Sequence, residues 1–403
     1  MRILSLSSWF PYPPDNGARI RLRHLLAALG AVHAVDLLCF FHGQEERVAP
    51  EVLPPGIVLL GALPAPTDWR RLSLGGLLSP YPRAVADQFV PEMANRLADA
   101  LSPARYDLVL AFEIGPGVTT APYLLEVRGA RRVVEDLEIS MIRAKARTAR
   151  SPLARLRYGL TWQKQRRYTR ELLREVDGCT VTSEPERRAV LDVAPDGKPV
   201  AVVPNGVDLE QYRGDFGPVE PDALVFPGAL TYEANFEAMR FFLGEVFPRI
   251  RRARSQATLY ITGRTDGVDL SCLPLGDGVV LTGYLPDVRP RVARSAVCIA
   301  PLTLGGGTRI KILEAMALGT PVVATSKGAE GLDVTPGRDL LIADGPEAFA
   351  AAVVRVLETP ELRASLSAAG RRLVAERYDW RTIGQQLNAF LEQIYHQDTN
   401  LHR

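Results

Sequence analysis

Three consecutive glycines and then Thr-Arg-Ile-Lys stand in the stretch LGGGTRIKILEAMALGTPVVAT, which runs from residue 304 to residue 325. Consecutive glycines cost backbone entropy, and their commonest use is to let the main chain approach another molecule closely. Arg309 and Lys311 fall in the first turn of the helix that this stretch predicts. The helix dipole disfavours cations there unless an anion lies nearby. We therefore predict an anion site, of the kind that holds a phosphate group. A tight surface turn with two solvated cations is the alternative.

Short apolar strands alternate with helical patterns along the whole chain. Near-continuous apolar strands of this kind are typical of parallel sheets that helices cover on both faces. The Gly-, Pro- and acid-rich segment RGDFGPVEPDA interrupts the pattern, which then starts again. The sequence therefore predicts an α/β fold with two doubly wound, Rossmann-like domains. In such sheets ligands bind at the carboxyl ends of the strands, so we expect the site in a cleft that the two domains face.

The predicted boundaries follow from the same pattern. They are an N-terminal domain over 1–205, a linker over 206–222, a C-terminal domain over 223–376, and a last helix over 377–403 that packs back toward the first domain.

Composition places the chain among ordinary globular proteins. It has 403 residues, 47% of them hydrophobic and 23% charged, a length that suggests about two domains. The four cysteines stand far apart without a C-x-x-C pair, which predicts reduced thiols and a cytoplasmic location. The N-terminus reaches a tryptophan and prolines before an apolar core of secretory length develops, and no run of 18 apolar residues predicts a membrane span.

Several enzyme classes lack their motifs. A dehydrogenase should carry G-x-G-x-x-G after a strand, and although Gly305 and Gly307 have the first spacing, Ile310 stands at the third position. No G-x-x-x-x-G-K-[ST] occurs, which argues against a P-loop protein. The sequence also has no D-x-D and no clustered His or Cys, so we predict no metal site.

Five segments occur in one order along the chain: NGARIRLRHLLAAL, VVPNGVDLEQY, GYLPDVRPRVARSAVCIAPL, LEAMALGTPVVAT and KGAEGL. In this order and spacing they resemble the GT-B glycosyltransferases, in particular glycosyltransferase family 4 (group 1), over essentially the whole chain. The resemblance implies a hexosyl- or glycosyltransferase that moves a sugar from a nucleotide-sugar donor to a saccharide, lipid-linked or small-molecule acceptor. It further implies retention at the anomeric carbon and no cofactor or essential metal. A sugar-nucleotide epimerase on the same fold and a non-catalytic nucleotide-sugar binding protein stay open as alternatives.

The chain departs from the family pattern at two points. The family's Glu-x7-Glu pattern keeps its second member as Glu314, but Gly306 stands at the first. The Arg and Lys that many members carry after the first strand of the nucleotide domain are also missing from the corresponding loop, GALTYEAN (228–235). A subset of the family is similar at both points, with G-G-x-T-R-x-K before the Glu. The resemblance thus implies that Arg309 and Lys311 replace the missing cations.

The roles of single residues are also implied by the resemblance. Arg309, with Lys311, neutralises charge on the departing diphosphate, and Glu314 accepts hydrogen bonds from the ribose hydroxyls. Glu113 and Asp136 are candidates for contacting the acceptor hydroxyl or orienting the sugar, although acids at strand ends often only cap the next helix. These five are the predicted catalytic residues. The predicted donor-binding residues are Asn16, Gly17, Gly228, Arg264, Tyr284, Gly305, Gly306, Gly307 and Thr308.

Three of these assignments have plain structural alternatives. Asn16 and Gly17 also suit a simple turn, and Arg264 a surface position. Tyr284 is expected to frame the nucleotide base through backbone groups, and a packing tyrosine is the alternative.

The segment 143–174 carries eleven basic residues and one acid, with Tyr158, Trp162 and Tyr168 interleaved. It predicts either a solvated helical face or a surface for peripheral contact with anionic lipid headgroups on the inner face of the membrane. No recognised nucleic-acid fold accompanies the charge, so nucleic acid is not a predicted partner.

Overall fold

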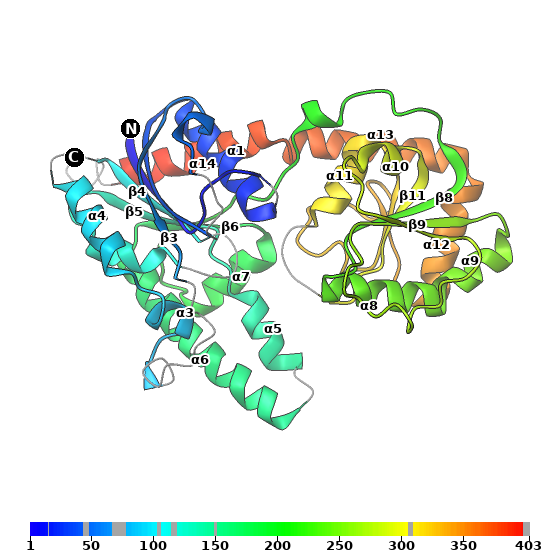
Figure 1. Ribbon diagram of the computed structural model, residues 1–403, viewed down its shortest axis with the longest axis horizontal. Helices are drawn as coiled ribbons and strands as arrows, with labels where there is room; N and C mark the ends of the chain where they lie inside the picture. Colours follow the sequence, from blue (N-terminus) through cyan, green and yellow to red (C-terminus); the bar gives the residue numbers. More distant parts are fainter. Residues whose placement is uncertain are drawn as a thin grey trace. The chain divides into compact units, whose positions relative to one another are not determined.

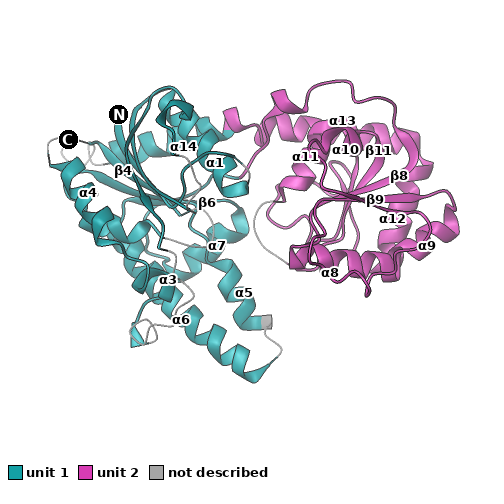
Figure 2. Ribbon diagram, viewed as in Figure 1, with its two compact units in different colours: residues 1–204, 383–403 teal, residues 205–382 magenta. Residues whose placement is uncertain are grey.

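The computed structural model describes residues 1–14, 16–42, 48–66, 78–102, 106–113, 119–148, 151–304 and 309–397. Figure 1 follows the chain from end to end, and Figure 2 colours its two compact units. Unit 1 comprises Met1–Pro204 and Ile383–Arg403, and unit 2 comprises Asn205–Thr382.

Unit 1 contains a parallel sheet with the strand order β3-β2-β1-β4-β5-β6-β7. The strands are β1 (Arg2–Ser7), β2 (Ala34–Phe41), β3 (Ile57–Pro64), β4 (Leu108–Phe112), β5 (Arg131–Glu135), β6 (Gly178–Val181) and β7 (Val200–Val202). Every residue of β4 is buried, whereas β3, at the edge, is partly exposed along its length. Burial on both faces explains why the central strands are apolar without alternation.

Helices connect and cover these strands (Figure 1). They are α1 (Gly17–Gly30), α3 (Arg83–Ala86), α4 (Pro91–Leu101), α5 (Ser140–Thr148), α6 (Pro152–Glu175), α7 (Glu184–Val193) and α14 (Trp380–His396), with the 3₁₀ turns η1 (Pro50–Val52) and η2 (Ala121–Glu126). Leu22, Leu25 and Leu29 make a buried stripe on α1 at the spacing of an amphipathic helix. Helix α14 packs on α1, because Asn388 donates a hydrogen bond to the carbonyl of Ala28 over 3.1 Å.

Unit 2 contains a second parallel sheet, with the order β10-β9-β8-β11-β12-β13. The strands are β8 (Glu220–Pro227), β9 (Thr258–Thr262), β10 (Val279–Gly283), β11 (Ser295–Ala300), β12 (Val322–Ala324) and β13 (Leu341–Ile342). Alternate residues of β8 enter two different cores: Leu224 and Phe226 belong to one, and Val225 to the other. Unit 2 is therefore also a sheet between two helical layers.

The helical elements of unit 2 are η3 (Leu209–Tyr212, 3₁₀), α8 (Glu233–Phe241), η4 (Phe242–Val246, π), α9 (Phe247–Ala253), α10 (Arg289–Ala293), α11 (Ile310–Leu318), α12 (Pro346–Glu358) and α13 (Pro360–Arg377). The predicted linker 206–222 belongs to this unit, because η3 lies in it and β8 begins at its third residue from the end. Helix α11 ends at Gly319, whose φ of 79° favours glycine and turns the chain into β12.

Strand order reverses once in each sheet. The reversal lies between β1 and β4 in unit 1 and between β8 and β11 in unit 2. The connections after two such strands leave on opposite faces, which opens a crevice at their carboxyl ends where open α/β sheets bind ligands. The predicted doubly wound α/β fold is confirmed. The carboxyl ends of the strands at the two reversal points are the expected places for the predicted site residues.

Candidate active site

Arg309 is the N-cap residue of α11 and stands at the carboxyl edge of the unit 2 sheet. Its side chain is buried, and Nη2 donates a hydrogen bond to the carbonyl of Lys327 over 3.3 Å. Burial lowers the pKa of Arg309, because removing the guanidinium from water disfavours its charged form. An anion bound at the start of α11 would offset that desolvation. The predicted neighbours Gly305, Gly306, Gly307 and Thr308 lie outside the described residues.

Lys311 reaches from α11 to the end of β8. Its Nζ donates a hydrogen bond to Oδ1 of Asn235, in the first turn of α8, over 2.7 Å. The amine also lies 4.2 Å from the ring centroid of Phe226, a cation–π contact. Burial lowers the pKa of Lys311 to about 8, and the charge of Arg309 acts in the same direction. The amine is therefore a desolvated cation at the point where strand order reverses in unit 2.

Gly228 provides the space that this amine occupies. A Cβ atom at residue 228 would lie 2.8 Å from Lys311 Nζ and 2.8 Å from Nδ2 of Asn235. The same Nδ2 donates a hydrogen bond to the carbonyl of Ala229 over 2.8 Å, so the amide of Asn235 is held on both sides. Gly228 thus contributes to the site through its missing side chain.

Glu314 lies one helical turn after Lys311 and has a partner that the sequence did not reveal. The hydroxyl of Tyr212, in η3, donates a hydrogen bond to Oε1 of Glu314 over 2.6 Å. Burial raises the pKa of Glu314, while this hydrogen bond and the charge of Lys311 oppose the rise. The hydrogen bond from Tyr212 thus fixes the position of the Glu314 carboxylate through Oε1. The only signal for Tyr212 was its place at the end of VVPNGVDLEQY.

Arg264 and Tyr284 come together at the ends of β9 and β10. The Arg264 guanidinium carbon lies 5.3 Å from the centroid of the Tyr284 ring. The tyrosine is 64% exposed, so its ring is a surface feature and not part of a core. A stacked arginine and tyrosine offer a flat face for a planar ligand. In the sheet, β8 separates β9, the strand before Arg264, from β11.

Asn16 and Gly17 begin α1 in unit 1. The side chain of Asn16 caps the helix, because its Oδ1 accepts a hydrogen bond from the backbone N–H of Arg19 over 3.1 Å. Gly17 is the first helical residue. The structure thus gives both residues a role in starting α1, at the carboxyl end of β1.

Glu113 follows β4, and its carboxylate is occupied by its own chain. It accepts hydrogen bonds from Thr119 Oγ1 over 2.6 Å, from the backbone N–H of Thr120 over 2.5 Å, and from that of Ala121. Burial raises the pKa of Glu113, against the effect of these hydrogen bonds. This is a capping arrangement, the alternative that the sequence left open. We therefore assign Glu113 no role in contacting the acceptor.

Asp136 lies directly after β5 beside a buried ion pair. Arg21 of α1, which is fully buried, bonds Glu135, and its Nε lies 3.7 Å from Oδ2 of Asp136. Among the residues that the structure describes, Asp136 is the non-glycine residue whose φ is positive, at 65°. Its backbone N–H donates a hydrogen bond to Thr180 Oγ1 over 3.1 Å. Burial raises the pKa of Asp136 to about 7, Arg21 opposes this, and Glu135 adds to it. A strained backbone and a titratable carboxylate at a strand end are features that cluster at functional sites.

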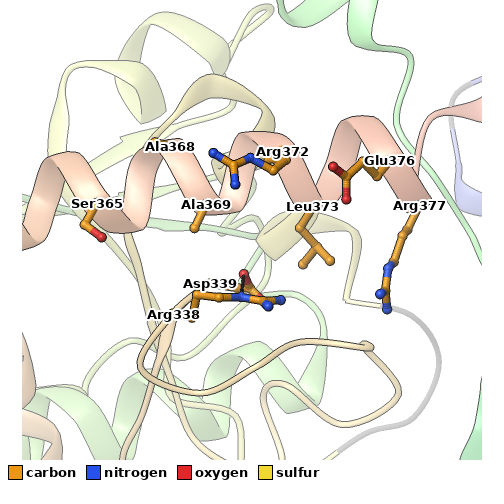
Figure 3. A pocket seen from close by; sticks show the side chains of 9 residues that line it. All are labelled: Arg338, Asp339, Ser365, Ala368, Ala369, Arg372, Leu373, Glu376 and Arg377. Atoms are coloured by element: carbon orange, nitrogen blue, oxygen red, sulfur yellow. Dashed lines mark hydrogen bonds and ion pairs between the residues drawn. The ribbon is translucent and has the colours of Figure 1, made fainter.

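A cavity of about 520 Å³ lies elsewhere in unit 2, beneath α13 (Figure 3). Arg338 and Asp339 line it and form a two-bond ion pair of 2.8 and 2.9 Å. None of the predicted donor or catalytic residues lines this cavity. Because it lies apart from those residues, this cavity is not the candidate site.

Among the described residues, no three His, Cys, Asp or Glu side chains are grouped so that they could hold a metal ion.

Two family models match the chain. Glycosyltransferase Family 4 matches residues 15–211, and Glycosyl transferases group 1 matches residues 221–359. The chain is also similar to phosphatidyl-myo-inositol mannosyltransferase of Mycobacterium tuberculosis, with 29% identity over 56% of this chain and 62% of that protein. It thus spans less than two thirds of the length of this relative.

Two solved structures have the same fold over nearly the whole chain. Sucrose-phosphate synthase from Thermosynechococcus elongatus gives a TM-score of 0.66 at 18% identity, covering 98% of this chain and 99% of that one. HepE of Anabaena, in complex with UDP and glucose, gives a TM-score of 0.63 at 16% identity, covering 98% of this chain and 100% of that one.

Proposed function

This chain belongs to the group 1 glycosyltransferases of the GT-B fold, and on that premise we propose that it transfers a sugar from a nucleotide-sugar donor to an acceptor hydroxyl, with retention and without a metal ion. The observation that carries the proposal is the pair of desolvated cations at the start of α11, Arg309 and Lys311, at the reversal point of the unit 2 sheet.

The two cations suit the diphosphate of the donor. As the bond between the sugar and the diphosphate breaks, negative charge grows on the phosphate oxygens, and fixed cations in a poorly solvated place stabilise it strongly. In this proposal Arg309 and Lys311 do what a metal ion does in other transferases. Glu314, held by Tyr212 on one oxygen, takes the ribose hydroxyls with the other. Arg264 and Tyr284 bind the base.

Asp136 is the acceptor-side residue in this proposal. Its carboxylate, at the end of β5, accepts a hydrogen bond from the acceptor hydroxyl or from the sugar that carries it. A carboxylate with a pKa of about 7 is ionised for this purpose only at neutral pH and above.

We include a membrane-linked acceptor in the proposal. The relative in Mycobacterium is by its name a transferase to a phosphatidylinositol. The basic segment 143–174 gives this chain a surface for peripheral contact with the inner face of a membrane, where a lipid-linked saccharide would be presented.

Incubation of the purified protein with UDP- and GDP-sugars, with and without extracts of lipid-linked and soluble saccharides, tests the proposal. Release of nucleoside diphosphate that depends on acceptor supports transfer. Conversion of the donor sugar without acceptor would identify an epimerase. Donor binding that raises the melting temperature, without turnover on any acceptor, would identify a binding protein.

A further inference from the structure

Helices α5 and α6 form a hairpin that projects from unit 1 (Figure 1). The second half of α6 is anchored, because Tyr168, Thr169, Leu172 and Leu173 are buried. The first half has no buried residue. In the described part of the chain, no helix is both long and apolar enough to cross a bilayer.

Three leucines line one side of the exposed half of α6. Leu153, Leu156 and Leu160 are 81%, 62% and 57% exposed. Their spacing of three and four residues places them on one face of the helix. Single exposed leucines are common, but a contiguous apolar stripe on the projecting half of a helix marks a binding surface.

Basic residues surround this stripe. Helices α5 and α6 together contain ten Arg and Lys residues and two Glu residues. Arg157 lies one position after Leu156 with its guanidinium carbon 4.7 Å from the Tyr158 ring centroid, and Lys164 continues the leucine face one turn beyond Leu160. Two acidic residues pair with these cations near the anchored parts of the hairpin. Asp192 pairs with Arg143, and Glu171 pairs with Arg167.

We propose that the stripe of Leu153, Leu156 and Leu160 inserts into the surface of an anionic lipid bilayer while the arginines and lysines of α5 and α6 contact the headgroups. An apolar face of a few leucines between cations is the pattern of helices that lie in the interface, with side chains reaching roughly 5–10 Å into the headgroup and acyl boundary. The inference deepens the peripheral contact included in the proposed function and rests on it.

The positive charge of the hairpin favours an anionic bilayer over a second copy of this chain as the partner of the leucine stripe. Two copies that met through the leucine stripe would bring two strongly basic hairpins together, and like charges across an interface are unfavourable. An anionic bilayer covers the same leucines and neutralises the same cations. Each basic residue near such a surface adds to the attraction.

Sedimentation of the full chain with vesicles tests this directly. The vesicles are phosphatidylcholine alone, or phosphatidylcholine with phosphatidylglycerol, each at low salt and at 0.5 M salt, where the Debye length falls to about 4 Å. We expect binding to the anionic vesicles, weakened by salt. The triple variant Leu153→Ser, Leu156→Ser, Leu160→Ser should lower the partition coefficient at least about tenfold.

Matched variants separate this effect from general changes. Leu275→Ser alters an exposed leucine of unit 2, and Arg252→Glu with Arg355→Glu alters exposed arginines of unit 2. We expect these controls to bind as the wild type does, and Arg157→Glu with Arg166→Glu to lose binding to the anionic vesicles. An unchanged melting temperature of the triple variant shows that it is folded.

Three outcomes would overturn the inference: wild-type binding by the triple variant, equal binding to neutral vesicles, or light scattering that shows a leucine-dependent dimer in place of vesicle binding. Vesicle binding needs no donor, so the test separates the two proposals. Sugar transfer without vesicle binding refutes the docking surface alone, and vesicle binding without transfer on any acceptor refutes the proposed function alone.

Discussion

Replacing Lys311 with methionine should stabilise the chain at neutral pH. Burial lowers the pKa of Lys311 from 10.5 to about 8. At about 1.4 kcal/mol for each pKa unit, the charged amine is about 3 kcal/mol less favourable in the native chain than in the unfolded chain. The variant loses the hydrogen bond to Asn235, which contributes about 1 kcal/mol. We therefore expect the free energy of unfolding at pH 7 to rise by about 2 kcal/mol, the difference of these two effects.

The sign of the pH dependence follows from the lowered pKa. Between pH 8 and 10.5 the native chain releases the Lys311 proton while the unfolded chain keeps it, so the cost of the buried charge fades as pH rises. The stability advantage of Lys311→Met over the wild type should be complete below pH 8 and should disappear as pH approaches 10.5, where only the loss of the hydrogen bond, about 1 kcal/mol, remains. Other groups titrate alike in both proteins and cancel in the difference.

Donor binding should change in the opposite direction. Because only the protonated amine attracts the diphosphate, the dissociation constant of the wild type for a nucleoside diphosphate should rise about tenfold for each pH unit above 8. Lys311→Met should bind more weakly below pH 8 and lack this dependence.

Urea denaturation at pH 7 and pH 10, and calorimetric titration with a nucleoside diphosphate, measure both effects. Lys198→Met is the matched control, because it makes the same replacement at an exposed lysine of unit 1 and should leave stability and binding unchanged. A stability difference that is the same at both pH values, or a loss of stability in Lys311→Met at pH 7, would show that the amine is not a desolvated cation.

Three further predictions address the other charged groups. Arg309→Ala should lower kcat by about 10²–10³ with little change in donor KM, because the cation acts on charge that appears during the reaction; steady-state kinetics with wild-type values would refute this role. Glu314→Gln should raise donor KM by about tenfold, and Tyr212→Phe about fivefold through loss of one hydrogen bond, each with kcat nearly unchanged; a fall in kcat alone would contradict the assignment to donor binding. Acceptor kcat/KM should rise as pH increases through about 7, where the carboxyl group of Asp136 ionises, and Asp136→Asn should flatten this profile; a pH profile unchanged by the substitution would exclude Asp136 from acceptor binding.

The sequence predicted the fold because strand and helix periods are local signals. The apolar runs of β4 and β11 are continuous because both faces of each sheet are covered, and the turn residues at their ends marked the edge where ligands bind. The same local signals placed Arg309 and Lys311 at the start of α11. They could not tell the surroundings of two acids that both follow strands: Glu113 accepts hydrogen bonds from Thr119 and Thr120, whereas Asp136 lies beside Arg21.

The sequence could not predict which residues hydrogen-bond to the charged side chains of the site. Asn235 is 76 residues from Lys311, and Tyr212 is 102 residues from Glu314. Each contact exists because β8 and β11 are neighbours in the sheet although two strands lie between them in the chain. Arg21 of α1 and Glu135 of β5 are likewise 114 residues apart in the chain and form a buried ion pair. Such pairs are invisible until the strand order is known.

The strand order also brings a cation to the loop after β8, which itself lacks the Arg and Lys that the family resemblance predicts. The amine of Lys311 enters that place from α11, which begins next to β8 because β11 lies beside β8. A side chain at Gly228 would collide with the amine at 2.8 Å, and the amide of Asn235 at 2.7 Å supplies the acceptor that a buried ammonium requires. Gly228, Asn235 and Lys311 therefore form one unit, in which the glycine leaves space for the amine and the asparagine accepts its hydrogen bond. We infer that Lys311 supplies from α11 the positive charge that the family resemblance expects from the loop after β8.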